Sequence, residues 1–334
     1  MDVVVRLNHR GHNESAVQAE HLKLPDLGLR LKAQGIHNNY LFKDNIPEYP
    51  RPEFWVSQLK HDTNEGGLFG IAVESQGGFC ARDREEGPED PEEGPEGLDL
   101  LWWSLSLGAE EMASAEQRLL QTRYPDRTEE QAREQKSFLQ RFATSPAFLD
   151  TSRLGSYRFT FPLEELLKRY REQLCGGHEP ILRVYETVLY KQEVMYSVLV
   201  HSHFNNDLFE KYPLLQDNDD GVCAYRDGQI IWRPEAMCNT HSFKLVPKPY
   251  QNQHVAHLIP DPQKHQFYVW DNIAVAFHMD GSQMLTFDMY NLRAHLRFCE
   301  PGTPPISPDC EFTTYEEAKD RVDCYWPYYH TPLF

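Results

Sequence analysis

Residues 58–79, QLKHDTNEGGLFGIAVESQGGF, decide the fold of this chain. A short strand pattern ends at His61-Asp62-Thr63, a short amphipathic segment follows, and the stretch closes on Gly77-Gly78-Phe79. Neighbouring side chains of a strand point to opposite faces, so we expect His61 and Thr63 to share one face and Asp62 to point to the other. His61 and Thr63 would then be placed to contact the same ligand.

Two further runs accompany this stretch. Residues 100–106, LLWWSLS, form an apolar strand pattern in which Trp102 or Trp103 offers a large flat surface on which a ligand ring can stack. Residues 190–200, YKQEVMYSVLV, are rich in β-branched and apolar side chains and therefore also indicate a strand. We expect both runs to belong to the same α+β domain as residues 58–79.

The order of these elements resembles the ADP-ribosyltransferase fold of the poly(ADP-ribose) polymerases, in which a His-Gly-Thr strand end is followed by a helix and a Gly-Phe turn. In that family the His and Thr hold the adenosine-side ribose of NAD, and the Gly backbone holds the nicotinamide amide. The resemblance implies that His61, Asp62 and Thr63 bind NAD or an ADP-ribose-like ligand. Asp62 stands in place of the family's Gly and would add a negative charge near the pyrophosphate.

The family's two other site residues differ in this chain. Residues 100–106 correspond to the strand that carries a stacking Tyr in the family, and Trp103 would form that pocket wall. Residues 190–200 correspond to the strand of the catalytic Glu, and aligning the apolar run places Tyr196, or Met195, at its position. A Tyr supplies no negative charge to an oxocarbenium-like transition state. The resemblance therefore implies a degenerate transferase, unless Glu193 acts as the catalytic carboxylate.

A wider set of runs is similar to a fish-specific family that was named for its induction by grass carp reovirus, as induced gene two. The runs are residues 101–106, 142–149, 152–161, 190–194 and 223–235. The resemblance covers most of residues 50–330, whereas the polymerase resemblance covers about residues 50–203. It implies an interferon-induced protein of antiviral innate immunity with protein partners from the host or the virus.

Composition excludes several other functions. The net charge of −18 argues against a protein that binds nucleic acid by neutralising phosphates, and against docking on anionic membranes. No apolar run approaches the roughly 20 residues that span a bilayer. The N-terminal residues do not have the pattern of a secretory signal, and the seven cysteines form no dense framework. We therefore expect reduced thiols and a cytoplasmic protein.

The chain is expected to divide into an arm and two domains. Residues 1–45 are polar and predict a mobile N-terminal arm, and residues 46–205 predict the ADP-ribosyltransferase-like domain with its split β-sheet. Within it, the acidic, Pro- and Gly-rich residues 83–97 predict a disordered loop. Residues 206–334 predict a second, β-rich α+β domain, in which Asp280-Gly281 indicates a hairpin turn between strands at 267–277 and 284–287.

A zinc site is an alternative that the spacing leaves open. Cys238 and His241 are followed by His254 and His257 at a zinc-like spacing. The connecting residues SFKLVPKPYQNQ lack the packing residues of a zinc finger, so we predict no metal.

Three functions follow from these patterns. The first is a degenerate transferase-like protein that binds NAD, ADP-ribose-like ligands or protein partners through His61, Thr63 and Trp103. The second is an active, NAD-dependent mono-ADP-ribosyltransferase that uses Glu193 or another carboxylate. The third is an interaction scaffold without a ligand, in which His61 is only a core residue.

Overall fold

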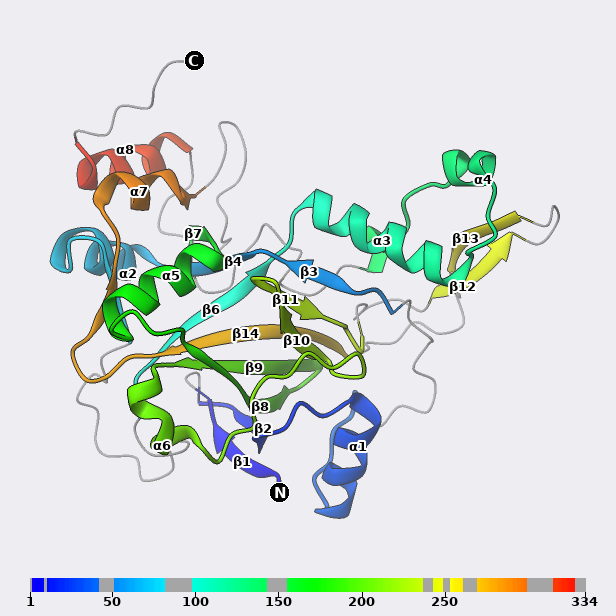
Figure 1. Ribbon diagram of the computed structural model, residues 1–334, viewed down its shortest axis with the longest axis horizontal. Coiled ribbons are helices and arrows are strands. Elements are labelled where there is room, and N and C mark those ends of the chain that lie inside the picture. Colours follow the sequence, from blue (N-terminus) through cyan, green and yellow to red (C-terminus); the bar gives the residue numbers. More distant parts are fainter. Residues whose placement is uncertain are drawn as a thin grey trace.

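The structure, a computed structural model, shows a mixed α/β architecture built on one large sheet (Figure 1). It describes residues 2–8, 11–41, 51–81, 98–142, 155–236, 243–248, 253–260, 269–298 and 315–327. The expected combination of helices and strands is therefore confirmed at this coarser level. The acidic loop at 83–97 lies outside the described residues.

Nine strands form one continuous sheet in the order β1-β2-β8-β9-β14-β6-β4-β7-β16. Among the described strands of this sheet, β9 and β14 are the only parallel neighbours, and every other pair is antiparallel. The bounds are β1 Val4–Leu7, β2 Asn13–Gln18, β4 Gln58–Thr63, β6 Leu100–Ser106, β7 Tyr157–Pro162, β8 Ile181–Tyr190, β9 Glu193–His201, β14 Trp270–His278 and β16 Leu296–Arg297.

Strands from all three expected segments lie in this one sheet. β1 and β2, from the expected arm, pair with each other, and β2 pairs with β8. β14, from the expected second domain, lies between β9 and β6 and pairs with both. The boundary expected near residue 206 does not separate two sheets, because β14 supplies the strand that joins β9 to β6.

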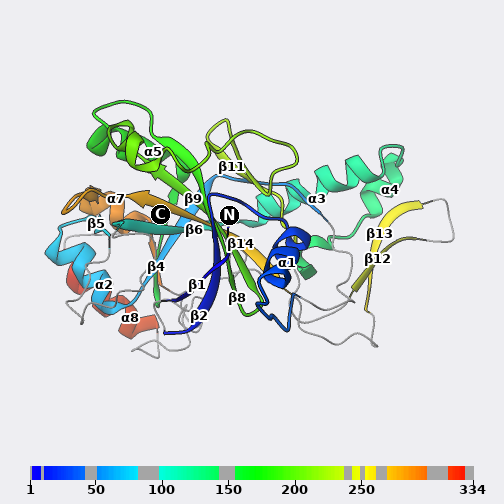
Figure 2. The ribbon, with the colours of Figure 1, turned by 90° about the horizontal axis from the view of Figure 1, so that it is seen from below.

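Three small sheets flank the large one. β3 (Phe54–Val56), β10 (Cys223–Arg226) and β11 (Gln229–Trp232) form the first. β5 (Gly78–Cys80) and β15 (Met284–Thr286) form the second. β12 (Phe243–Lys248) and β13 (Gln253–Pro260) form the third, which projects beside α4, away from the large sheet (Figure 2).

The hairpin expected around Asp280-Gly281 is wrong. Gly281 does adopt the positive φ of a turn, at 60°. The strands on either side separate, however, because β14 pairs with β9 and β6 while β15 pairs with β5. Met284 thus lies opposite Cys80, and the Gly-Gly-Phe turn is held by residues from the far end of the chain.

Helices pack around the sheet. α5 shows why a sequence pattern forms a helix here: Leu163, Leu166, Leu167 and Tyr170 recur at helical spacing, and all four are buried. The helices are α1 Leu24–Ala33, α2 Glu65–Phe69, α3 Ala109–Arg123, α4 Glu129–Glu134, α5 Leu163–Leu174, α6 Asn206–Phe209, α7 Met289–Ala294 and α8 Tyr315–Tyr325. Within the described residues, no helix is long and apolar enough to cross a membrane.

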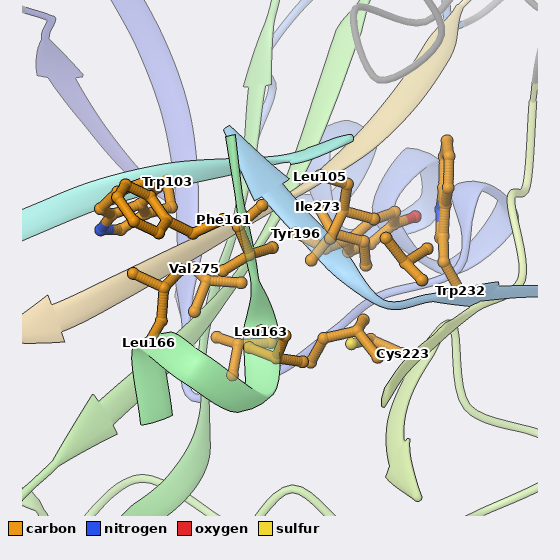
Figure 3. Packing of buried hydrophobic residues seen from close by; sticks show 14 of the residues in the cluster. Trp103, Leu105, Phe161, Leu163, Leu166, Tyr196, Cys223, Trp232, Ile273 and Val275 are labelled. Carbon is orange, nitrogen blue, oxygen red and sulfur yellow. The ribbon is translucent and has the colours of Figure 1, made fainter. Parts of the chain in front are cut away.

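One continuous core covers a face of the large sheet. It contains Trp103 and Leu105 of β6, Phe161 of β7, Tyr196 of β9 and Ile273 of β14 (Figure 3). These side chains alternate along their strands with residues on the other face, as the period of two requires. His61 and Trp103 lie toward one end of this face, and Tyr196 lies toward the other.

Candidate functional site at the end of β4

His61 lies among aromatic rings at the end of β4. Its ring meets Phe79 edge-on at a centroid distance of 5.4 Å and lies 5.3 Å from the ring of Trp103. The side chain is half-buried, between fully buried and open. The chain turns directly after β4 because Asn64 caps α2: its side-chain oxygen accepts a hydrogen bond from the Gly67 amide at 2.9 Å.

The hydrogen bond of His61 fixes its tautomer. Nδ1 lies 2.9 Å from the carbonyl oxygen of Trp102, and a carbonyl oxygen only accepts, so Nδ1 carries the proton. Burial lowers the pKa of His61 below its ordinary value of 6.5, while the Trp102 carbonyl and the charge of Asp62 oppose that shift. The imidazole is therefore neutral at pH 7. Its Nε2 is a hydrogen-bond acceptor, and no described residue donates to it.

Thr63 is held in place by two close backbone approaches. A Cβ on Gly67 would lie 2.0 Å from the Thr63 hydroxyl oxygen, and a Cβ on Gly155 would lie 2.0 Å from the Thr63 carbonyl oxygen. Gly155 also has a φ of 155°, which favours glycine. Thr63 itself is buried, and alternation in β4 puts it on the face of His61, as expected.

Asp62 faces the other side of β4, as expected, and it is not an isolated charge. Arg158, directly opposite on β7, donates to both carboxylate oxygens, from Nε at 2.6 Å and from Nη2 at 3.0 Å. Both side chains are more than nine-tenths buried. The Asp62 carboxylate is thus paired with Arg158 and turned away from the face on which His61 lies.

Trp103 lies close to His61, but its side chain belongs to the buried core and does not form the open wall of a pocket. It is 1% exposed and packs against Phe79 at 5.2 Å and Phe161 at 6.0 Å. Its indole nitrogen is buried with no hydrogen-bonding partner in the described structure. Trp102, the alternative, points to the opposite face and is 37% exposed.

Tyr196 and Glu193 do not join this group. The Tyr196 hydroxyl donates to the Leu22 carbonyl at 2.8 Å, and its side chain is fully buried. Burial raises the pKa of Tyr196 well above its ordinary value, so it stays a neutral hydroxyl. Figure 3 shows Trp103 and Tyr196 at separate positions along the sheet.

Glu193 lies farther away still. Register places Trp103 opposite Val275 and Glu193 opposite Trp270, which separates the two by two strand spacings and five positions. Those offsets correspond to roughly 10 Å across the sheet and roughly 16 Å along it. Glu193 accepts instead from the side-chain amide of Asn272 at 3.1 Å. The structure therefore brings together His61, Thr63 and Trp103, with Asp62 behind them, and leaves Tyr196 and Glu193 elsewhere.

Phe79 is the residue whose importance the sequence did not reveal. Its ring contacts the rings of His61, Trp103, Phe159, Phe161 and Phe287. The sequence signal that could have identified Phe79 is the Gly77-Gly78 pair that precedes it. A Cβ on Gly77 would lie 2.2 Å from the Phe287 carbonyl oxygen, and Gly77 has a φ of 100°. The turn thus requires glycine and delivers Phe79 into the aromatic group.

The expected metal alternative lies largely outside what the structure describes. Cys238 and His241 are beyond the described residues, and the side chains of His254 and His257 on β13 are not described. In the described part of the chain, no group of three or more His, Cys, Asp or Glu side chains is placed to hold a metal ion.

Comparison with protein-family models, with curated proteins and with solved structures finds no match to this chain.

Proposed function

We propose that this protein is an interferon-induced antiviral protein of the cytoplasm whose ADP-ribosyltransferase-like sheet binds an ADP-ribose-like ligand without transferring it. Protein partners from the host or the virus would read out the bound state. One observation carries the proposal: His61 offers a neutral, tautomer-fixed acceptor beside Thr63, and none of the described groups that contact its ring is a carboxylate.

The chemistry of the site favours binding over transfer. A ribose hydroxyl can donate to Nε2 of His61, because Nδ1 is already held by the Trp102 carbonyl. Transfer from NAD develops positive charge on the nicotinamide-side ribose, and a carboxylate is the group that stabilises such charge. Glu193 is separated from Trp103 by two strand spacings and five positions, so it does not fill that role.

The test is a calorimetric titration of the full chain with ADP-ribose and with NAD. Replacing His61 by Ala removes the acceptor, and we expect affinity to fall by about tenfold or more, as for loss of a buried hydrogen bond. His178→Ala is the matched control, because His178 is exposed and its ring packs against His203, not against the rings around His61. A circular dichroism melt of each variant shows whether the fold is kept.

Two results would count against the proposal. Absence of heat from well-folded wild-type protein with either ligand would favour the scaffold function. Incorporation of label from NAD that is lost in Glu193→Gln would instead favour an active transferase.

A further inference from the structure

A second site of different character lies between α1, β3, α3 and the loops that flank β10 and β11. It is a cleft of about 560 Å³. Four basic side chains (Lys23, Arg51, Arg118 and Arg233) and four acidic ones (Glu53, Asp219, Asp220 and Glu235) line it. α3, β3 and β11 lie side by side here, and β3 pairs with β11 (Figure 1).

Arg118 is a cation without a carboxylate partner among the described residues. Its guanidinium lies over the indole ring of Trp55, 4.8 Å from the centroid, and Nη2 donates to the Glu53 carbonyl oxygen at 2.7 Å. Its Nε is buried and has no acceptor in the described part of the chain. Burial lowers the pKa of Arg118, and Glu53 opposes the shift, but an arginine stays charged at any ordinary pH. The indole therefore holds a charged fork in a fixed position at the wall of the cleft.

Arg233 lies on the other side of Glu53. Its Nε donates to a Glu53 carboxylate oxygen at 2.7 Å, and Nη1 donates to the carbonyl oxygens of Asn218 and Gly221 at 3.0 and 3.1 Å. Nη2 has no hydrogen-bond acceptor among the described residues, and it forms a longer ion pair with Asp219 at 3.8 Å. The second Glu53 oxygen is taken by the indole N–H of Trp55 at 2.7 Å.

Arg118 is thus a guanidinium group of the cleft that has no ion-paired carboxylate among the described residues, whereas Arg233 is paired with Glu53 and lies 3.8 Å from Asp219. Guanidinium groups match the oxygens of phosphate and carry their charge at every working pH. We propose that this cleft binds the phosphoryl group of a small phosphate-bearing molecule, with Arg118 as the main contact and Arg233 beside it.

The rim restricts the size of that ligand. Asp219 has a side chain that is 92% exposed, and Asp220 is also exposed at the same edge. A long polyanion such as RNA would pass close to these carboxylates, whereas a compact phosphate ester avoids them. The proposal does not rest on the function proposed for His61, because the two sites share no residue.

Pyrophosphate is the probe, titrated calorimetrically into the full chain at constant ionic strength adjusted with sodium chloride. Arg118→Met keeps much of the side-chain stem over Trp55 and removes the charge, and we expect affinity to fall at least tenfold. Arg123→Met is the control, because Arg123 is an exposed arginine at the end of the same helix and does not line the cleft.

A second variant keeps the proposal falsifiable if Arg118→Met unfolds. Asp220→Asn removes a negative charge from the rim at an exposed position, so pyrophosphate should bind about twofold more tightly. The proposal is overturned if wild-type protein gives no saturable heat, or if folded Arg118→Met binds like Arg123→Met. It is also overturned if Arg118→Met unfolds and Asp220→Asn leaves affinity unchanged.

The two proposed sites can fail separately. ADP-ribose itself contains a pyrophosphate, so both sites must be assayed with both probes. Pyrophosphate binding in His61→Ala should equal that of wild type. If ADP-ribose binding is lost in Arg118→Met and kept in His61→Ala, the cleft is the nucleotide site and the function proposed for His61 fails.

Discussion

Polar side chains at the two ends of one face of the large sheet have different environments. At the β4–β6 end, His61 uses one nitrogen on a backbone carbonyl and keeps the other as an acceptor. At the β9–β14 end, the Tyr196 hydroxyl is bonded to the Leu22 carbonyl under α1, and the whole side chain is buried. Similar apolar strand patterns therefore produce a ligand candidate at one end and only core at the other.

The largest expected effect is the loss of Trp103. Trp103→Ala removes a 1% exposed ring from the aromatic group around Phe79 and should lower the free energy of unfolding by about 3–5 kcal/mol. Trp102→Ala, on the opposite face and 37% exposed, should cost less than about 1 kcal/mol. Urea unfolding curves measure both, and equal losses would show that the two faces are not distinct in the way described.

Next in size is the ion pair behind His61. Arg158→Met leaves the Asp62 carboxylate buried and unpaired, which should cost about 3 kcal/mol. Adding Asp62→Leu to that variant should restore most of the loss, because no buried charge then remains. If the double variant is as unstable as the single one, charge burial is not what destabilises it.

A smaller loss is expected at the other end of the face. Tyr196→Phe deletes the hydroxyl that bonds the Leu22 carbonyl and should cost about 1–2 kcal/mol. ADP-ribose affinity should stay at the wild-type value. A change in ADP-ribose affinity at unchanged stability would mean that Tyr196 influences ligand binding. The two ends of the sheet face would then not differ in the way described.

The smallest effect concerns pH. The folded pKa of His61 is lowered, so its contribution to stability is complete above the unfolded value of about 6.5 and is lost as pH falls through the folded pKa. Burial likewise lowers the pKa of His21 and of His201 to about 4, so wild-type stability should fall between pH 6.5 and 4.

His61→Gln should make that fall shallower without removing it, as measured by thermal unfolding at a series of pH values. Trp102→Ala, which keeps the backbone carbonyl that His61 bonds, should leave the slope unchanged. An unchanged slope in His61→Gln would contradict a half-buried His61 that is neutral at pH 7.

Local sequence patterns predicted where strands and helices form. They did not predict which elements pack beside one another. The strand patterns that end at Thr63 and that cover residues 100–106 and 190–200 correspond to β4, β6 and β9. Each depends on residues a few positions apart, so the sequence contains the whole signal.

Local sequence patterns did not predict which strands pair over long distances in the chain. The insertion of β14 between β9 and β6 depends on contacts between residues far apart along the chain, and nothing in the run 270–278 specifies its neighbours. β2 reads as polar in sequence, yet Ala16 and Val17 are buried against the sheet. Composition therefore predicted a mobile arm at residues 1–45, whereas strand pairing places β1 and β2 in the large sheet.

The same difference between local and long-range prediction applies to the candidate site. His61, Asp62 and Thr63 were placed correctly relative to one another because they are consecutive in one strand. Their relation to Tyr196 and Glu193 depended on an alignment to another family, and the register of three strands separates them. Phe79 was missed as a centre because its five ring partners come from distant segments.

The central place of β14 has a consequence for synthesis. β9 ends at His201, and its parallel partner is complete only at His278. A ribosome adding about 5–20 residues per second therefore leaves the apolar edges of β9 and β6 open for roughly 4–15 s. During that interval the nascent chain is a natural client for chaperones, and a product truncated near residue 205 would keep both edges open permanently.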